Sequence, residues 1–185
     1  MKLSFIYSPA YDNMLTSMAL QEFSNAQIVE VKQYISDLEV FWENEEKRII
    51  KEIEKVSGLN FQKKIDCYVI KNMQFTAFSM PLTIKMDPKF SRVRAVLIHE
   101  LIHFLLSSHR STKTLIHKLN ARYPAKDHEF KSHLPVYLIQ KKVLENLFGE
   151  ESIKKDMKGQ VDNDVQIEAN KLYKNFNKNI LRFFK

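Results

Sequence analysis

The scarcity of glycine is the feature that most restricts how this chain can fold. Three glycines and five prolines among 185 residues leave few positions at which the backbone can turn sharply. Long regular elements, mainly helices, are therefore favoured over a loop-rich or all-β fold. A hydrophobic fraction of 44% and an aromatic fraction of 11% supply a core for a single domain, which we predict over residues 1–185.

The spacing of apolar residues predicts the order strand, helix, two strands and then further helices. Short β-branched and aromatic runs are typical of strands, and apolar residues three and four positions apart are typical of helices. The predicted strands are Leu3–Tyr7, Ile65–Ile70 and Leu82–Met86, the last flanked by Pro81 and Pro88 as an edge strand would be. The predicted helices are Asn25–Val56 (one long or two short), Phe90–Ser107, Thr112–Arg122, Pro135–Phe148 and Asn163–Phe184. The predicted class is α+β, a mainly helical domain with a small sheet.

Cysteine content and charge bear on the compartment and the partners. The single cysteine, Cys67, lies in an apolar run without a disulfide partner, and we interpret it as a small buried hydrophobe. No apolar segment develops into a signal-peptide core or a membrane span, which favours a cytoplasmic protein. The net charge is +7, but the lysines are scattered through helical segments. This scatter argues against specific nucleic-acid binding.

The sequence His99-Glu100-Leu101-Ile102-His103 lies inside the most apolar predicted helix. Residues four apart share one face of a helix, so His99 and His103 can bind the same metal ion. A catalytic zinc ion needs three protein ligands and an open position for water, and Glu100 can take a proton from that water. The alternative is a polar stripe without metal, although unpaired polar groups on a core helix are destabilising.

Four later residues are candidates for the third zinc ligand. They are His133, Glu129, His128 and His109. His133 is preferred, because it stands beside Pro135, where the next helix is predicted to begin and to pack against the first. Glu129 is the second choice. Tyr137, one helical turn after His133, can donate to the oxyanion of a tetrahedral intermediate, although a core tyrosine is the simpler interpretation.

The HELIH helix, preceded by strands and followed by helices, resembles the zincin clan of metallopeptidases over about Ile65 to Phe148. The resemblance implies that His99 and His103 bind zinc and that Glu100 serves as general base and acid. It also implies that the strand Leu82–Met86 offers a free edge to an extended peptide, which would bind by main-chain hydrogen bonds. Leu106 replaces the metzincin glycine, and neither a methionine turn nor a gluzincin glutamate motif is clear.

These features predict a zinc metallopeptidase that hydrolyses peptide or protein substrates with Glu100 as the general base. One alternative is a zincin-fold binding or regulatory protein with little activity. Another rests on Asp127-His128-Glu129-Phe130, which resembles a segment of the SprT-like proteases that act on proteins crosslinked to DNA. That alternative requires a basic surface continuous with the site and a salt-sensitive affinity for DNA.

Overall fold

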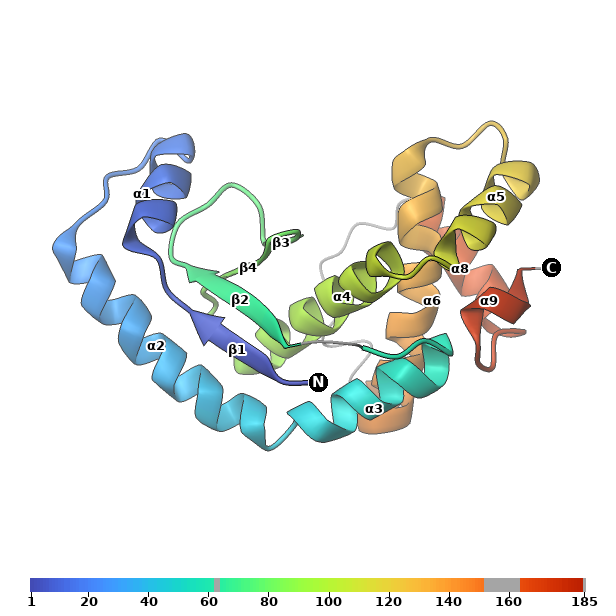
Figure 1. The fold of residues 1–185 in the computed structure, drawn as a ribbon, viewed down its shortest axis with the longest axis horizontal. Helices are drawn as coiled ribbons and strands as arrows, with labels where there is room; N and C mark the ends of the chain where they lie inside the picture. Colours follow the sequence, from blue (N-terminus) through green and yellow to red (C-terminus); the bar gives the residue numbers. More distant parts are fainter. Residues whose placement is uncertain (62–63, 152–163, 185) are drawn as a thin grey trace. The chain divides into compact units, whose positions relative to one another are not determined.

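The computed structural model describes residues 1–61, 64–151 and 164–184, which contain four strands and eight helices (Figure 1). The strands are β1 (Leu3–Ile6), β2 (Ile65–Ile70), β3 (Ala77–Ser79) and β4 (Leu82–Lys85). The helices are α1 (Pro9–Met18), α2 (Asn25–Glu43), α3 (Glu46–Ser57), α4 (Phe90–Ser108), α5 (Thr112–Arg122), α6 (His128–Phe148), α8 (Asp164–Tyr173) and α9 (Ile180–Phe183). The α+β class with a small sheet is thus confirmed. Among these residues, no helix has the length and apolar character needed to cross a membrane.

Residue contacts divide the chain into two units. Unit 1 comprises Met1–Lys47 with Gln62–Glu100, and unit 2 comprises Arg48–Phe61 with Leu101–Lys185. The boundary after Glu100 falls inside the continuous helix α4, so this helix contributes residues to both units. The single domain over 1–185 stays a prediction, because parts of one domain can also form separate contact clusters.

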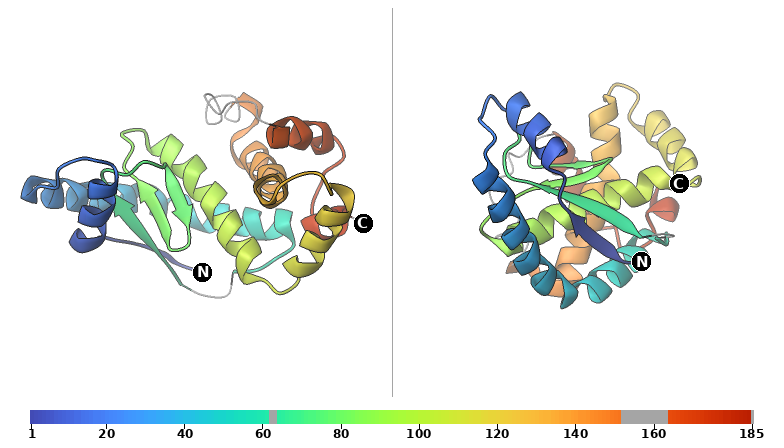
Figure 2. Two further views of the ribbon diagram at one scale, coloured as in Figure 1. Left: turned by 90° about the horizontal axis from the view of Figure 1, so that it is seen from above. Right: turned by 60° about the vertical axis from the view of Figure 1, so that its left-hand side comes forward.

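Unit 1 is built on a four-stranded mixed sheet in the order β1-β2-β4-β3 (Figure 2). Strands β1, β2 and β4 are parallel, and β3 runs antiparallel to β4. Helix α2 packs against β1 and β2. The prediction that Leu82–Met86 is an edge strand was wrong, because β4 is paired on both sides. Strand β3, which is only three residues long and was not predicted, forms that edge instead.

Helix α1 was also not predicted, although its start has a recognisable signal. Ser8 caps the helix by accepting a hydrogen bond from the backbone N–H of Tyr11 at 3.3 Å, and Pro9 occupies the first helical position. Proline is favoured there because the first amide groups of a helix have no intrahelical acceptor. The helix places Asp12 in the interior of unit 1, where the carboxylate is fully buried.

Unit 2 is centred on the long helix α6, which packs against α5 and α8. The prediction that this helix begins at Pro135 was wrong, since it begins at His128. The N-cap is Asp127, whose carboxylate accepts a hydrogen bond from the backbone N–H of Phe130 at 2.8 Å. This cap satisfies an otherwise unpaired donor of the first turn. Pro135 therefore lies inside the helix, where it cannot donate to the carbonyl of Lys131.

The C-terminal segment of unit 2 forms two helices, α8 and α9, rather than the single predicted helix Asn163–Phe184, whose first residue lies outside the described residues. Asn179, which precedes α9, adopts a left-handed conformation with φ of 60°. Its backbone N–H donates to the carbonyl of Val56 at 2.7 Å. Its side chain lies against Gly58, where an added Cβ would approach Asn179 Cγ to 2.7 Å. The close approach ties the C-terminal segment to the end of α3.

Candidate metal centre

Helix α4 carries two of the candidate ligands on one face. The neighbouring side chains Leu97, Ile98, Leu101 and Ile102 are fully buried, whereas His99 and His103 are partly exposed. The apolar residues hold the helix in the interior, and the helical spacing sets the two imidazoles one turn apart. Both rings are therefore positioned by a rigid element, as a metal site requires.

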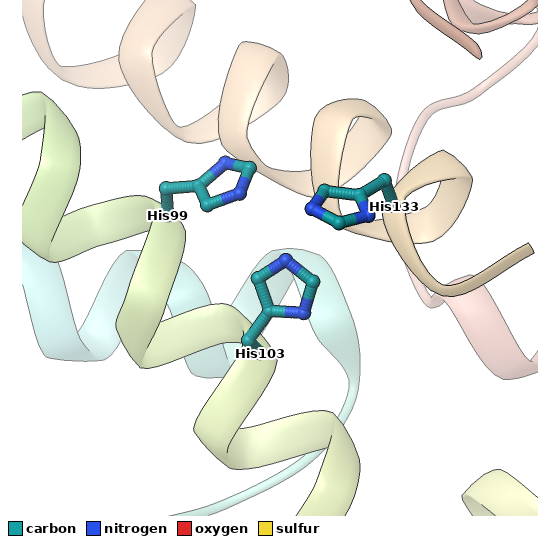
Figure 3. Close-up of side chains that lie close together, drawn as sticks. All are labelled: His99, His103 and His133. Carbon is teal, nitrogen blue, oxygen red and sulfur yellow. The ribbon is translucent and has the colours of Figure 1, made fainter. Parts of the chain in front are cut away.

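Helix α6 brings a third imidazole to this pair. His133 lies in the second turn of α6, and one ligand nitrogen each from His99, His103 and His133 lies within 4.8 Å of the other two. Figure 3 shows the three rings turned toward a common space, two from α4 and one from α6. The ring centroids of His103 and His133 are 4.6 Å apart, at an interplanar angle of 76°. We call these three residues the histidine cluster.

Two contacts orient the His133 ring. Its Nδ1 lies 3.0 Å from the backbone carbonyl oxygen of Glu129 and 3.3 Å from Ser132 Oγ, and the carbonyl accepts from Nδ1 in the tautomer with the hydrogen on that nitrogen. In the neutral ring Nε2 then holds the free lone pair. Such a hydrogen bond from the second nitrogen to a carbonyl is the usual way in which a protein orients a metal-binding histidine.

The histidine cluster has the composition and nearly the spacing of a tetrahedral metal site. Ligand nitrogens about 2.1 Å from one zinc ion lie about 3.4 Å from each other in that geometry, so shifts of about 1 Å would complete the site. Three imidazoles are a ligand set that zinc accepts, and they leave a fourth position open. Within the described residues, the histidine cluster is the group of three or more histidine, cysteine or acidic side chains close enough to share an ion.

Glu100 lies next to His99 and is partly buried. Burial raises the pKa of its carboxyl group to about 7, while a hydrogen bond from the hydroxyl of Ser79 in β3 acts in the opposite direction. A carboxyl group with a pKa near neutral pH can both accept and release a proton, which general acid–base catalysis requires. The sequence did not indicate Ser79, because a three-residue strand leaves no pattern that could have predicted its position.

Cys67 lies close enough to Glu100 to be affected by its charge. Its side chain is fully buried in β2, as the sequence predicted. Burial and the neighbouring carboxylate both raise the pKa of the Cys67 thiol far above its usual range. The thiol therefore stays protonated, and it behaves as an apolar side chain rather than as a nucleophile or metal ligand.

The remaining candidate ligands lie elsewhere. Glu129 lines a separate pocket with Asp127 and Asp164, and its backbone carbonyl lies 3.0 Å from His133 Nδ1. His109 Nε2 donates to the backbone carbonyl of Asn60 at 2.8 Å, and His128 lines a pocket beside α5. None of these three is in the group of side chains that could share an ion.

Tyr137 lies near the cluster, with its ring centroid 6.0 Å from that of His133 on the same helix. Its side chain is partly exposed. The predicted role of Tyr137 toward an oxyanion stays a prediction.

Comparisons with protein-family models, with curated proteins and with solved structures find no match to the chain.

Proposed function

We propose that the protein is a zinc-dependent metallopeptidase in which His99, His103 and His133 hold the metal ion and Glu100 is the catalytic base. The observation that carries the proposal is the convergence of one ligand nitrogen from each histidine to within 4.8 Å. The zincin resemblance of the HELIH helix supports His99 and His103 as ligands and Glu100 as the base.

A zinc ion held by three neutral imidazoles would supply Lewis-acid activation of a water molecule and of the peptide carbonyl. The Glu100 carboxylate accepts a proton from the attacking water as the new C–O bond forms. It then gives this proton to the leaving nitrogen as the C–N bond breaks, so that a carboxylic acid and an amine result. A hydrogen bond with Ser79 would restrain the Glu100 carboxyl group.

Glu100→Gln separates catalysis from metal binding. Glutamine keeps the size of the side chain and a partner for Ser79 but cannot carry the proton, so peptide hydrolysis should fall by about 10²-fold to 10⁴-fold. Zinc content should stay at the wild-type level, since Glu100 is not in the histidine cluster. The measurement is cleavage of a random peptide library by the zinc-loaded proteins, followed by mass spectrometry.

Two results would contradict the proposal. Equal hydrolysis by wild type and Glu100→Gln would remove Glu100 from the mechanism. Stable zinc binding by the wild type with no cleavage of any library peptide would favour a zinc-containing binding or regulatory protein instead.

A further inference from the structure

Unit 2 contains a pocket of about 650 Å³ beside the histidine cluster. It lies among the C-terminal end of α4, helix α5 and the first turns of α6, and His103 is one of its lining residues. The volume is in the range of ligand-binding pockets. Since His103 also belongs to the histidine cluster, a group bound in this pocket lies next to a metal ligand. We call it the α5 pocket.

The floor of the α5 pocket is apolar. Leu106 from α4, Leu115 from α5 and Pro135 from α6 line it, and all three are buried. These side chains come from three helices of the same unit, so the floor is part of the core of unit 2. An aliphatic or aromatic group can therefore be buried there with a gain in hydrophobic free energy.

The rim of the α5 pocket is basic. Arg110 and Lys113 lie at the end of α4 and the start of α5, both exposed, and His117 and His128 complete the rim. None of the described residues that line the pocket is Asp or Glu. Neither Arg110 nor Lys113 has an ion-pair partner in the part of the chain that the structure describes. A rim of this composition is complementary to an anion.

The acidic side chains at the start of α6 line another pocket. The Asp127 carboxylate is engaged with the backbone N–H of Phe130 at 2.8 Å. Asp127 and Glu129 both line a different pocket, together with Lys126. The basic rim and the acidic residues at the start of α6 are therefore presented to different pockets.

We propose that the α5 pocket binds a carboxylate-bearing residue of the peptide substrate, with the apolar stem on the floor and the carboxylate at Arg110 and Lys113. This inference rests on the proposed function for its choice of a peptide, and the anionic groups of an unmodified peptide are carboxylates. The carboxylate can come from a glutamate side chain or from the C-terminus. Arginine forms the stronger contact of the two cations because its guanidinium group can bind both carboxylate oxygens.

The test measures binding rather than turnover, with zinc-loaded Glu100→Gln protein and four fluorescein-labelled tetrapeptides. Two of them end in leucine, as the free acid or as the amide, and two are amidated and contain glutamate or glutamine at the third position. In one of the two pairs we expect the peptide with the carboxylate to bind at least about tenfold more tightly than its partner. This is the free acid compared with its amide, or the glutamate peptide compared with the glutamine peptide. The pair that shows the difference identifies the source of the carboxylate.

Charge reversal tests whether the basic rim causes the preference for the carboxylate peptide. Arg110→Glu with Lys113→Glu should abolish the preference for the carboxylate peptide, because both cations are replaced by anions. The matched control is Lys47→Glu with Lys51→Glu, which makes the same change of charge at two exposed residues of α3 that do not line the pocket. This control should keep the preference, and circular dichroism should show both doubly substituted proteins folded.

Equal binding of both members of each peptide pair by the wild-type rim would overturn the inference, as would a preference that survives in Arg110→Glu with Lys113→Glu. Failure of the proposed function is distinguishable. A carboxylate preference without any cleavage by the zinc-loaded wild type would support the pocket and contradict the peptidase. Cleavage without the preference would support the peptidase and contradict the proposed role of the pocket.

Discussion

Two polar clusters of this protein can be compared, because each gathers several polar side chains and the two differ in the kinds of group that they bring together. In unit 1 the Asp12 carboxylate accepts hydrogen bonds from Tyr7 Oη at 3.0 Å and Gln27 Nε2 at 2.8 Å. It also accepts from Thr16 Oγ1 at 3.5 Å and from the backbone N–H of Lys71 at 3.3 Å. We call Asp12 and these partners the Asp12 cluster.

The histidine cluster differs in what its members can offer one another. The Asp12 cluster pairs one acceptor group with four donors of the same chain, so it needs nothing from outside. The histidine cluster brings together three rings of the same kind, and His133 Nδ1 already contacts a backbone carbonyl oxygen. Complementary partners give the Asp12 cluster a structural role, whereas the histidine cluster has the composition of the cation site that we propose.

The largest expected effect on stability comes from Asp12→Ala. Loss of a buried carboxylate leaves Tyr7, Gln27 and Thr16 without their common acceptor, and the free energy of unfolding should fall by about 3 to 5 kcal/mol. Urea denaturation measures the change. Asp66→Ala, at an exposed residue of β2, is the control and should change stability by less than about 0.5 kcal/mol. Loss of zinc from a folded Asp12→Ala protein would contradict the distinction between the Asp12 cluster and the histidine cluster.

A smaller effect is expected at the turn that follows α3. Gly58 has φ of +75°, and an added Cβ would meet the Asn179 side chain at 2.7 Å. Gly58→Ala should therefore destabilise the protein by about 2 kcal/mol, from backbone strain and displacement of Asn179. Its control is Gly149→Ala, with φ of +77° but nothing within 4 Å, which should cost about half as much. Equal losses in thermal melting would show that the contact with Asn179 is unimportant.

The smallest change of stability is expected at the N-terminus of α6, the helix that contains His133. Asp127→Ala removes the N-cap of α6 and should lower the free energy of unfolding by about 1 kcal/mol. Ser111→Ala is matched to it, because Ser111 is the N-cap residue of α5 but makes no capping hydrogen bond there. Zinc content should be unchanged in both proteins, since His133 keeps its own bond to Glu129. Loss of zinc from Asp127→Ala would mean that the helix end, and not the histidines alone, determines binding.

The sequence predicted best the helices and strands whose own residues show a regular spacing of apolar side chains. Thr112–Arg122 and Ile65–Ile70 were predicted with the bounds that the structure shows, because each combines a regular apolar period with clear flanking residues. Strand β3 was missed because three residues cannot display a period. The start of α6 was misplaced because Pro135 was taken as the first helical residue, whereas the cap at Asp127 determines it.

The candidate site also has a part that a local pattern predicts and a part that depends on how the helices pack. The proximity of His99 and His103 follows from helical spacing alone, so it could be predicted from five consecutive residues. The approach of His133 depends on how α6 packs, which no local pattern contains. The backbone role of Glu129 is harder still to foresee, because its carbonyl contacts His133 only when the helix begins before Glu129 and not at Pro135.

The proposed zinc ligands can be tested by elemental analysis of zinc in purified protein, with wild type compared with His133→Ala and Glu129→Ala after incubation with zinc and removal of the excess. Our account predicts about one zinc ion per chain in the wild type and in Glu129→Ala, and loss of the ion from His133→Ala. Wild type without zinc, or loss from Glu129→Ala with retention in His133→Ala, would contradict it.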